Sequence, residues 1–101
     1  MKNILIIGAG KSSSALVKYL LDTSEQEALF ITIADISIEN ANKLINKHRN
    51  SRAIILDVFD KHQRQKQIQK ADIVISMLPA RFHLDVAKDC ITFNKHMVTA
   101  S

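Results

Sequence analysis

The sequence contains few of the residues that interrupt regular structure. Among its 101 residues are two glycines and one proline, whereas a domain of average composition would carry about seven glycines. Its single cysteine, Cys90, excludes an internal disulfide framework and a cysteine metal cluster. No secretory signal pattern opens the chain, so the sequence favours a reducing, cytoplasmic location.

Long hydrophobic runs are also absent. No unbroken apolar run is longer than that of Ile4–Ile7, whereas a membrane-spanning helix needs about 20 apolar residues. We therefore expect no membrane partner. Hydrophobic residues still make up 47% of the chain, as in a globular protein. The length fits one domain with one core, and no boundary is visible within residues 1–101.

The excess of positive charge is small. The chain has 14 Lys and Arg residues against 10 Asp and Glu residues. Its densest group of cations, Lys61–Lys70, contains no aromatic side chain that could stack on a base. We interpret this segment as the solvated face of a helix, whose only large apolar residue is Ile68, and expect no nucleic-acid partner.

Short β-rich apolar runs alternate along the chain with segments of helical spacing. Such alternation predicts right-handed crossovers and an α/β, doubly wound Rossmann fold. We expect five parallel strands in the order 3-2-1-4-5, with helices covering both faces of the strands. The expected strands are Asn3–Ile7, Leu29–Ala34, Ala53–Leu56, Asp72–Met77 and His96–Thr99. The expected helices are Lys11–Leu21, Ser37 (as N-cap) to about His48, Lys61–Lys70 and Phe82 to Phe93.

Both glycines lie in one window, Gly8-Ala9-Gly10, directly after the first expected strand. In a dinucleotide-binding turn the first glycine makes the turn, and the second lets the backbone approach the pyrophosphate at a helix N-terminus. The third position is usually glycine or alanine, so the larger Ser13 requires looser packing or a partner for its hydroxyl. We expect the cofactor loop to comprise Gly8, Ala9, Gly10, Lys11, Ser12 and Ser13.

The segment Gly10-Lys11-Ser12 also resembles the end of a P-loop, G-x-x-x-x-G-K-[ST]. That motif needs a glycine five residues before Gly10, where this chain has Leu5 inside the expected strand. The sequence therefore does not predict a nucleoside triphosphatase.

Asp35 follows the second expected strand and is a candidate partner for the adenosine ribose hydroxyls. A carboxylate there would repel a 2′-phosphate, and the next residue is Ile36 rather than arginine. The cofactor is thus NAD or NADP, with NAD favoured from these residues. Alternatively, Asp35 only supports the cap of the next helix.

Two further segments follow strands at the same edge of the predicted sheet. Asp57 and Val58 are candidates for the adenine side, although an acidic residue there could serve turn chemistry alone. The loop Met77-Leu78-Pro79 follows the fourth strand and is expected near the nicotinamide half.

Four other residues have side chains that often act in catalysis, but none has a suitably spaced partner in the sequence. Cys90 falls on an apolar helical stripe with Phe82, Val86 and Phe93, which indicates a core position. We assign no catalytic residue and no metal ligand. The four are His83, Lys88, Cys90 and His96.

Over essentially its whole length the chain resembles the N-terminal cofactor domain of saccharopine dehydrogenase-like oxidoreductases, the saccharopine reductases and their relatives. The most specific likeness lies after the glycine turn, in the Leu-Pro loop and the last expected strand. The matching stretches are Ile6–Gly10, Thr32–Asp35, Leu56–Val58, Asp72–Ser76, Leu78–Pro79 with His83, and His96–Ser101.

The resemblance implies hydride transfer between a nicotinamide cofactor and a secondary amine that joins two amino-acid-like halves, as in lysine metabolism. It also implies a following substrate domain, so this stretch alone should bind cofactor without turnover. Ser13 and Ile36 depart from the family pattern. Many relatives carry arginine in place of Ile36 and saccharopine reductases use NADP(H), so the resemblance favours NADP where Asp35 favours NAD.

Two other function classes stay open. One is a non-catalytic NAD-sensing regulatory domain of the potassium-transport type, although such domains usually lack a loop like Leu78-Pro79. The other is a structural oligomerisation module that no longer binds nucleotide. A homodimer is compatible with the sequence, but self-association of this stretch could reflect apolar surface that a missing domain would cover.

Overall fold

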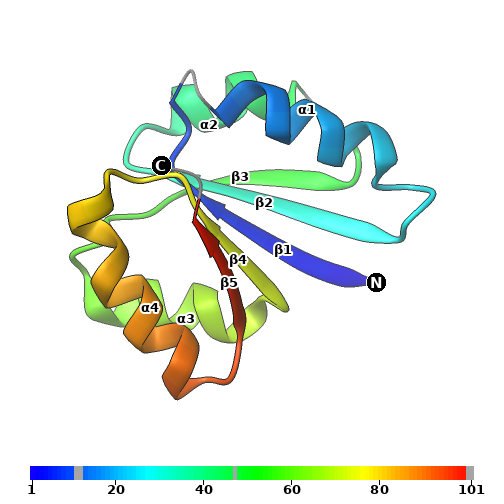
Figure 1. Ribbon diagram of the computed structural model, residues 1–101. Coiled ribbons are helices and arrows are strands. Elements are labelled where there is room, and N and C mark those ends of the chain that lie inside the picture. Colours follow the sequence, from blue (N-terminus) through cyan, green and yellow to red (C-terminus); the bar gives the residue numbers. More distant parts are fainter. Residues whose placement is uncertain (11–12, 47, 100–101) are drawn as a thin grey trace.

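The computed structural model describes residues 1–10, 13–46 and 48–99. Five parallel strands form one sheet in the order β3-β2-β1-β4-β5, which confirms the predicted fold class and strand order (Figure 1). The strands are β1 (Lys2–Ile7), β2 (Leu29–Asp35), β3 (Ser51–Ile55), β4 (Ile73–Ser76) and β5 (His96–Thr99). The helices are α1 (Ser14–Thr23), α2 (Ile38–Ile45), α3 (Lys61–Lys70), the short η2 (Ala80–Phe82) and α4 (His83–Thr92).

Local signals set both ends of α2. Ser37 caps α2 as predicted, because its Oγ accepts a hydrogen bond of 3.2 Å from the backbone N–H of Asn40. The expectation that this helix reaches His48 is wrong: Asn46 adopts a left-handed backbone, with φ of 45°, and ends α2 after Ile45. The predicted start of the first helix at Lys11 lies outside the described residues.

Alternate side chains of β1 enter two hydrophobic cores, one on each face of the sheet. Ile4 and Ile6 pack with Val17 and Leu21 of α1 and with neighbours from α2. Leu5 and Ile7 pack in the other core, whose helical members are Ile68 of α3 and Val86 and Cys90 of α4. In Figure 1, α1 and α2 accordingly lie on one side of the sheet, and α3 and α4 on the other.

The expectation that every strand is covered on both faces is wrong for the two edge strands. None of the four β5 residues is buried, and Val98 is 52% exposed. Residues of β3 are also exposed or half-buried. Two helices on each face cover the centre of the sheet, where β2, β1 and β4 lie, and leave its margins open to solvent.

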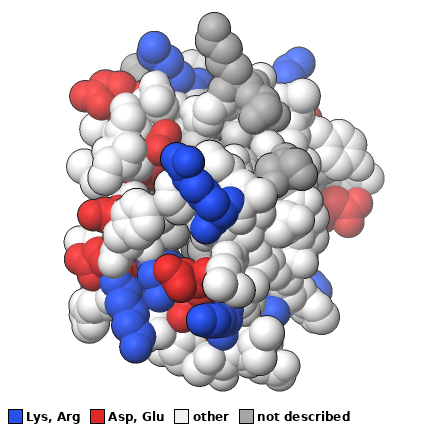
Figure 2. All heavy atoms as spheres, turned by 60° about the vertical axis from the view of Figure 1, so that its left-hand side comes forward, with Lys and Arg blue, Asp and Glu red and all other residues white. Residues whose placement is uncertain are grey.

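The polar helix α3 departs from its expected role in one respect. Ile68 is fully buried, as its place on the helix suggested, but Arg64 is buried as well. The solvated-face interpretation is therefore wrong for Arg64. On the face of the molecule drawn in Figure 2, Lys and Arg side chains lie among Asp and Glu side chains, without one large patch of either sign. No helix in the described ranges has the length and apolar character needed to cross a bilayer.

Ile68 is the buried apolar residue of the otherwise polar helix α3, so replacing it tests how much its packing contributes to stability. Ile68→Ala should lower the free energy of unfolding by about 2–5 kcal/mol, because it removes buried methyl groups and leaves a cavity. Ile91→Ala on α4, where the side chain is 81% exposed, should change it by less than about 0.5 kcal/mol. Urea denaturation followed by circular dichroism measures both; equal losses would contradict this packing.

Candidate functional site

The turn after β1 requires a glycine at its first position. Gly8 has φ of +104°, in the region that residues with a side chain rarely adopt. A Cβ there would lie 3.3 Å from the backbone carbonyl carbon of Met77. Gly8 therefore allows both the turn and the close passage of the loop after β4.

Gly10 is different, since the fold places no such demand on it. It is exposed and its φ is outside the left-handed region, and a Cβ there would meet nothing within 4 Å. The absence of a side chain leaves the backbone accessible from outside, which suits close approach by a ligand. Ala9 between the two glycines is buried, and Lys11 and Ser12 lie outside the described residues.

Ser13 has the hydroxyl partner that its size requires. The side chain is fully buried, and its Oγ donates a hydrogen bond of 3.0 Å to the carbonyl of Gly8. The backbone N–H of Ser13 also donates to the carbonyl of Gly10 at 3.0 Å. Serine at this position thus ties the start of α1 to the glycine turn.

A cavity of about 330 Å³ opens at the carboxyl ends of β1, β2 and β3. Its walls are mostly apolar and carry two carboxylates, Asp35 and Asp57. A cavity of this size with a few polar groups is typical of small-molecule sites. It brings together six residues that the sequence predicted and five that it did not. The lining residues are Ile7, Gly8, Ala34, Asp35, Ile36, Leu56, Asp57, Val58, Phe59, Leu78 and Phe82.

Asp35 ends β2 and faces this cavity. Its Oδ1 accepts a hydrogen bond of 2.8 Å from the backbone N–H of Ile36, which fixes the carboxylate at the rim. Ser37 itself caps the next helix, and the alternative that Asp35 only supports this cap stays a prediction. Ile36 is exposed beside it and adds no charge.

Asp57 lies in the loop between β3 and α3. Its Oδ1 accepts a hydrogen bond of 3.0 Å from the backbone N–H of Phe59, so the residue does serve turn chemistry. The same residue lines the cavity beside Val58. The two interpretations of Asp57 are therefore compatible.

The loop after β4 contributes unevenly to the cavity. Leu78 lines it, whereas Met77 and Pro79 do not. Met77 instead packs against Gly8, and its backbone N–H donates to the carbonyl of Ile7 at 2.8 Å. Met77 thus holds the loop beside the glycine turn.

Two aromatic residues complete the cavity and were not predicted as site residues. The rings of Phe59 and Phe82 meet edge to face, with centroids 5.2 Å apart and planes at 82°. The guanidinium of Arg81 lies 4.7 Å from the centroid of the Phe82 ring. Phe59 directly follows Val58 and could have been inferred from that position, while Phe82 was placed on a helical core stripe.

A second hollow, of about 530 Å³, lies on the other side of the glycine turn. Lys43 of α2 is the only Lys or Arg that lines either hollow in the part of the chain that the structure describes. Among the described residues of these two hollows, Lys43 is therefore the side chain whose positive charge could attract an anion bound near Gly10. The lining residues are Ala9, Gly10, Ser14, Asn40, Lys43 and Leu44.

The side chains considered for catalysis do not form a cluster. His83 shares a hydrogen bond of 2.7 Å, through Nδ1, with the hydroxyl of buried Ser76, a pairing that the sequence did not reveal. Lys88 and His96 are exposed, and Cys90 is buried in the core as predicted. Among residues 1–10, 13–46 and 48–99, no group of three or more His, Cys, Asp or Glu side chains is arranged to hold a metal ion.

A parallel sheet of this order, with a glycine turn between β1 and α1, defines the doubly wound Rossmann class. Residues 4–101 match the family model of the saccharopine dehydrogenase NADP binding domain, and the chain belongs to that family. The family resemblance inferred from the sequence is therefore confirmed.

Individual relatives agree with this assignment. The chain is 35% identical over 101 residues to a saccharopine dehydrogenase [NADP(+), L-glutamate-forming] of Schizosaccharomyces pombe, covering 100% of this chain and 22% of that protein. It is 30% identical to an alpha-aminoadipic semialdehyde synthase of Arabidopsis thaliana, covering 97% of this chain and 11% of that protein. The apo saccharopine dehydrogenase (L-Glu forming) of Saccharomyces cerevisiae superposes with a TM-score of 0.88 at 32% identity, over 100% of this chain and 22% of that one.

The two glycines should respond differently to the same substitution. Gly8→Ala should lower the free energy of unfolding by about 1–3 kcal/mol, because it forces a side chain into a strained backbone region. Gly10→Ala should change it by less than about 0.5 kcal/mol, because a methyl group there meets open space. Denaturant titration compares them, and equal destabilisation would show that Gly10 also has a structural role.

Cys90 should be chemically inert in the native chain. Burial, followed by the charge of neighbouring Asp89, raises the pKa of its thiol, so the reactive thiolate is scarce at neutral pH. We expect slow modification by a thiol reagent at about pH 8 and complete modification after denaturation. In a Cys90→Ala background, Ile91→Cys supplies an exposed control that should react at once; equal rates would contradict burial of Cys90.

Proposed function

We propose that this chain binds a nicotinamide dinucleotide along the carboxyl edge of its sheet. The observation that carries the proposal is the convergence of Gly8, Asp35, Asp57 and Leu78 on one cavity in a member of this family. The pyrophosphate would lie against the open backbone at Gly10, near Lys43. The residues present fit such a ligand, because a Cβ at Gly10 would occupy the space through which it approaches.

Each remaining candidate has a part in this proposal. Asp35 accepts the adenosine ribose hydroxyls, and the apolar walls with Asp57 and Val58 take the adenine ring. Ala9, Lys11, Ser12 and Ser13 complete the phosphate loop. Met77, Leu78 and Pro79 hold the strand end that borders the nicotinamide half. Ile36 covers the rim beside the ribose.

The cofactor we propose is NAD rather than NADP. A 2′-phosphate beside Asp35 would face a second carboxylate at Asp57, and no Lys or Arg among the described residues lines that cavity. Like charges without a counter-ion raise the energy of the bound state. The names of the S. pombe relative and of the matching family model both specify NADP, so on this point local chemistry and family differ.

The reaction follows from the family. We propose that the parent protein is an oxidoreductase acting on a CH–NH bond, in which the dinucleotide accepts or supplies hydride at a secondary amine joining two amino-acid-like halves. The chain spans about a fifth of the length of its S. pombe relative. In this proposal the residues that hold the amine lie outside this chain, which alone should bind the dinucleotide without turnover.

Calorimetric titration with NAD and NADP tests the cofactor assignment. We expect the wild-type chain to bind NAD more tightly than NADP. Asp35→Ala should lower the affinity for NAD by about tenfold or more and raise the affinity for NADP, because the carboxylate no longer binds the ribose or repels the phosphate. Gly10→Ala should abolish binding of both while the fold stays intact.

Lys43→Ala tests which phosphate lies near Lys43. If Lys43 lies near the pyrophosphate, the substitution should lower the affinities for NAD and NADP to the same degree. Tighter binding of NADP by the wild-type chain, lost selectively in Lys43→Ala, would refute the NAD preference and assign the 2′-phosphate to Lys43. A folded chain that binds neither cofactor would refute the proposed function itself.

A further inference from the structure

Arg64 is buried in an otherwise solvated helix. Its side chain is 7% exposed and that of its ion-pair partner, Asp89 of α4, is 5% exposed. By contrast, the side chains of the Arg49–Glu25 pair are 71% and 75% exposed. Removing two charges from water is costly unless geometry and further hydrogen bonds compensate. The buried pair therefore calls for a reason beyond stability.

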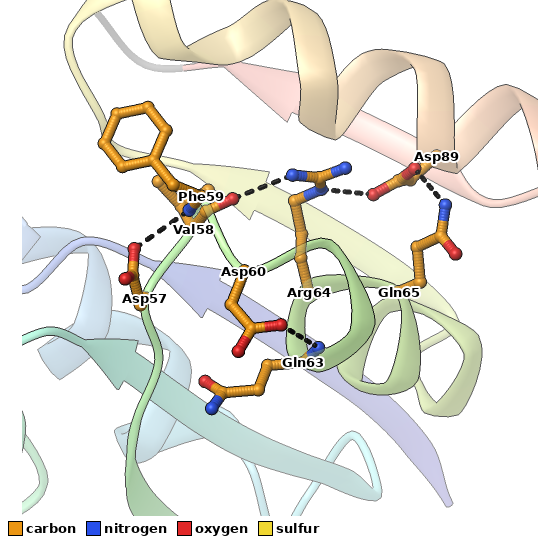
Figure 3. Close-up of polar contacts among 8 residues, drawn as sticks. All are labelled: Asp57, Val58, Phe59, Asp60, Gln63, Arg64, Gln65 and Asp89. Atoms are coloured by element: carbon orange, nitrogen blue, oxygen red, sulfur yellow. Dashed lines mark hydrogen bonds and ion pairs between the residues drawn. The ribbon is translucent and has the colours of Figure 1, made fainter.

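The guanidinium of Arg64 bridges two parts of the structure (Figure 3). Its Nε donates to Asp89 Oδ2 at 2.5 Å, and its Nη1 donates to the backbone carbonyl of Val58 at 2.8 Å. The second carboxylate oxygen of Asp89 accepts from Gln65 Nε2 at 3.0 Å. Asp89 is thus held on both oxygens, and Arg64 can reach the loop between β3 and α3 from a fixed position.

The peptide unit between Val58 and Phe59 is fixed on both sides. Its carbonyl accepts from Arg64, while its N–H donates to Asp57 Oδ1 at 3.0 Å. Figure 3 shows these two contacts on the same short loop, with the Phe59 ring beyond it. Rotation of this peptide plane would break both hydrogen bonds, so the plane has one preferred orientation. Asp57, Val58 and Phe59 are all cavity-lining residues.

The same ion pair connects opposite walls of the cavity. Arg64 belongs to the helix that follows Phe59, and Asp89 belongs to the helix that follows Phe82. The two rings meet edge to face at the cavity. The ion pair therefore joins the helices behind the two walls whose aromatic rings touch in front.

We propose that Arg64, held by Asp89, is a positioning residue that orients the Val58–Phe59 peptide and so shapes the adenine end of the dinucleotide site. The inference rests on the proposed function. It adds that affinity for the adenosine half depends on a contact located behind the cavity wall. The nicotinamide half, which we do not place against the Val58–Phe59 peptide, should not depend on this contact.

The test separates positioning from stability. Replacing a buried ion pair with apolar residues is often neutral for folding, so Arg64→Met with Asp89→Leu removes the contact to Val58 without leaving a buried charge. AMP and nicotinamide mononucleotide serve as probes of the two halves, with affinities measured by NMR titration. The double variant should bind AMP about five- to tenfold more weakly, on the scale of one hydrogen bond, and nicotinamide mononucleotide unchanged.

Two further variants give the comparison its controls. Arg64→Lys keeps a charge beside Asp89 but lacks the guanidinium fork that reaches both partners, so it should lose AMP affinity to a similar extent. Arg49→Met breaks the exposed pair and should leave both affinities unchanged.

Three outcomes would overturn the inference. Wild-type AMP affinity in the folded double variant would show that Arg64 does not position the loop. Equal loss for both probes would indicate general destabilisation. If either of these two results is found while the wild-type chain binds NAD, the proposed function stands and the inference alone fails. If the wild-type chain binds neither NAD nor AMP, both fail together.

Discussion

The close passage of two chain segments at Gly8 is the constraint on which the site depends. Gly8 donates its N–H to Ala34 at the end of β2 and accepts the hydroxyl of Ser13 at the start of α1. Met77, just past β4, packs so close that a Cβ at Gly8 would lie 3.3 Å from its backbone carbonyl carbon. One residue thus fixes the relative positions of three strand ends and one helix. The cavity lies on one side of this turn, at the carboxyl ends of β1, β2 and β3.

Most of the fold could be predicted because it follows from local pattern. Apolar runs and helical spacing located every strand and α-helix, and the handedness of parallel crossovers then set the strand order. The predictions failed where burial or a helix end depends on tertiary packing or on the backbone of one residue. Val98 belongs to an apolar run yet is half exposed, because its strand lies at the margin of the sheet. The early end of α2 depends on the backbone of Asn46, which no periodicity specifies.

The same distinction holds for the site. Asp35, Asp57 and Leu78 could be predicted, since residues that follow parallel strands must meet at one edge. Their lining of one cavity agrees with that reasoning, although their contact with a dinucleotide stays a prediction. The Phe59–Phe82 contact and the Arg64–Asp89 pair could not be predicted. Arg64 and Asp89 are 25 residues apart on different helices, and charged residues on a polar helix are ordinarily solvated.

The sharing of β1 between two cores has a consequence for how the molecule folds. Ile4 and Ile6 belong to one core and Leu5 and Ile7 to the other, all within a single strand. Neither core can open without disturbing the backbone that supports its opposite. The packing on the two faces of the sheet should therefore be lost in one cooperative transition. Since every strand pairing is parallel and spans a crossover, we expect folding to be slower than in helical bundles of equal length.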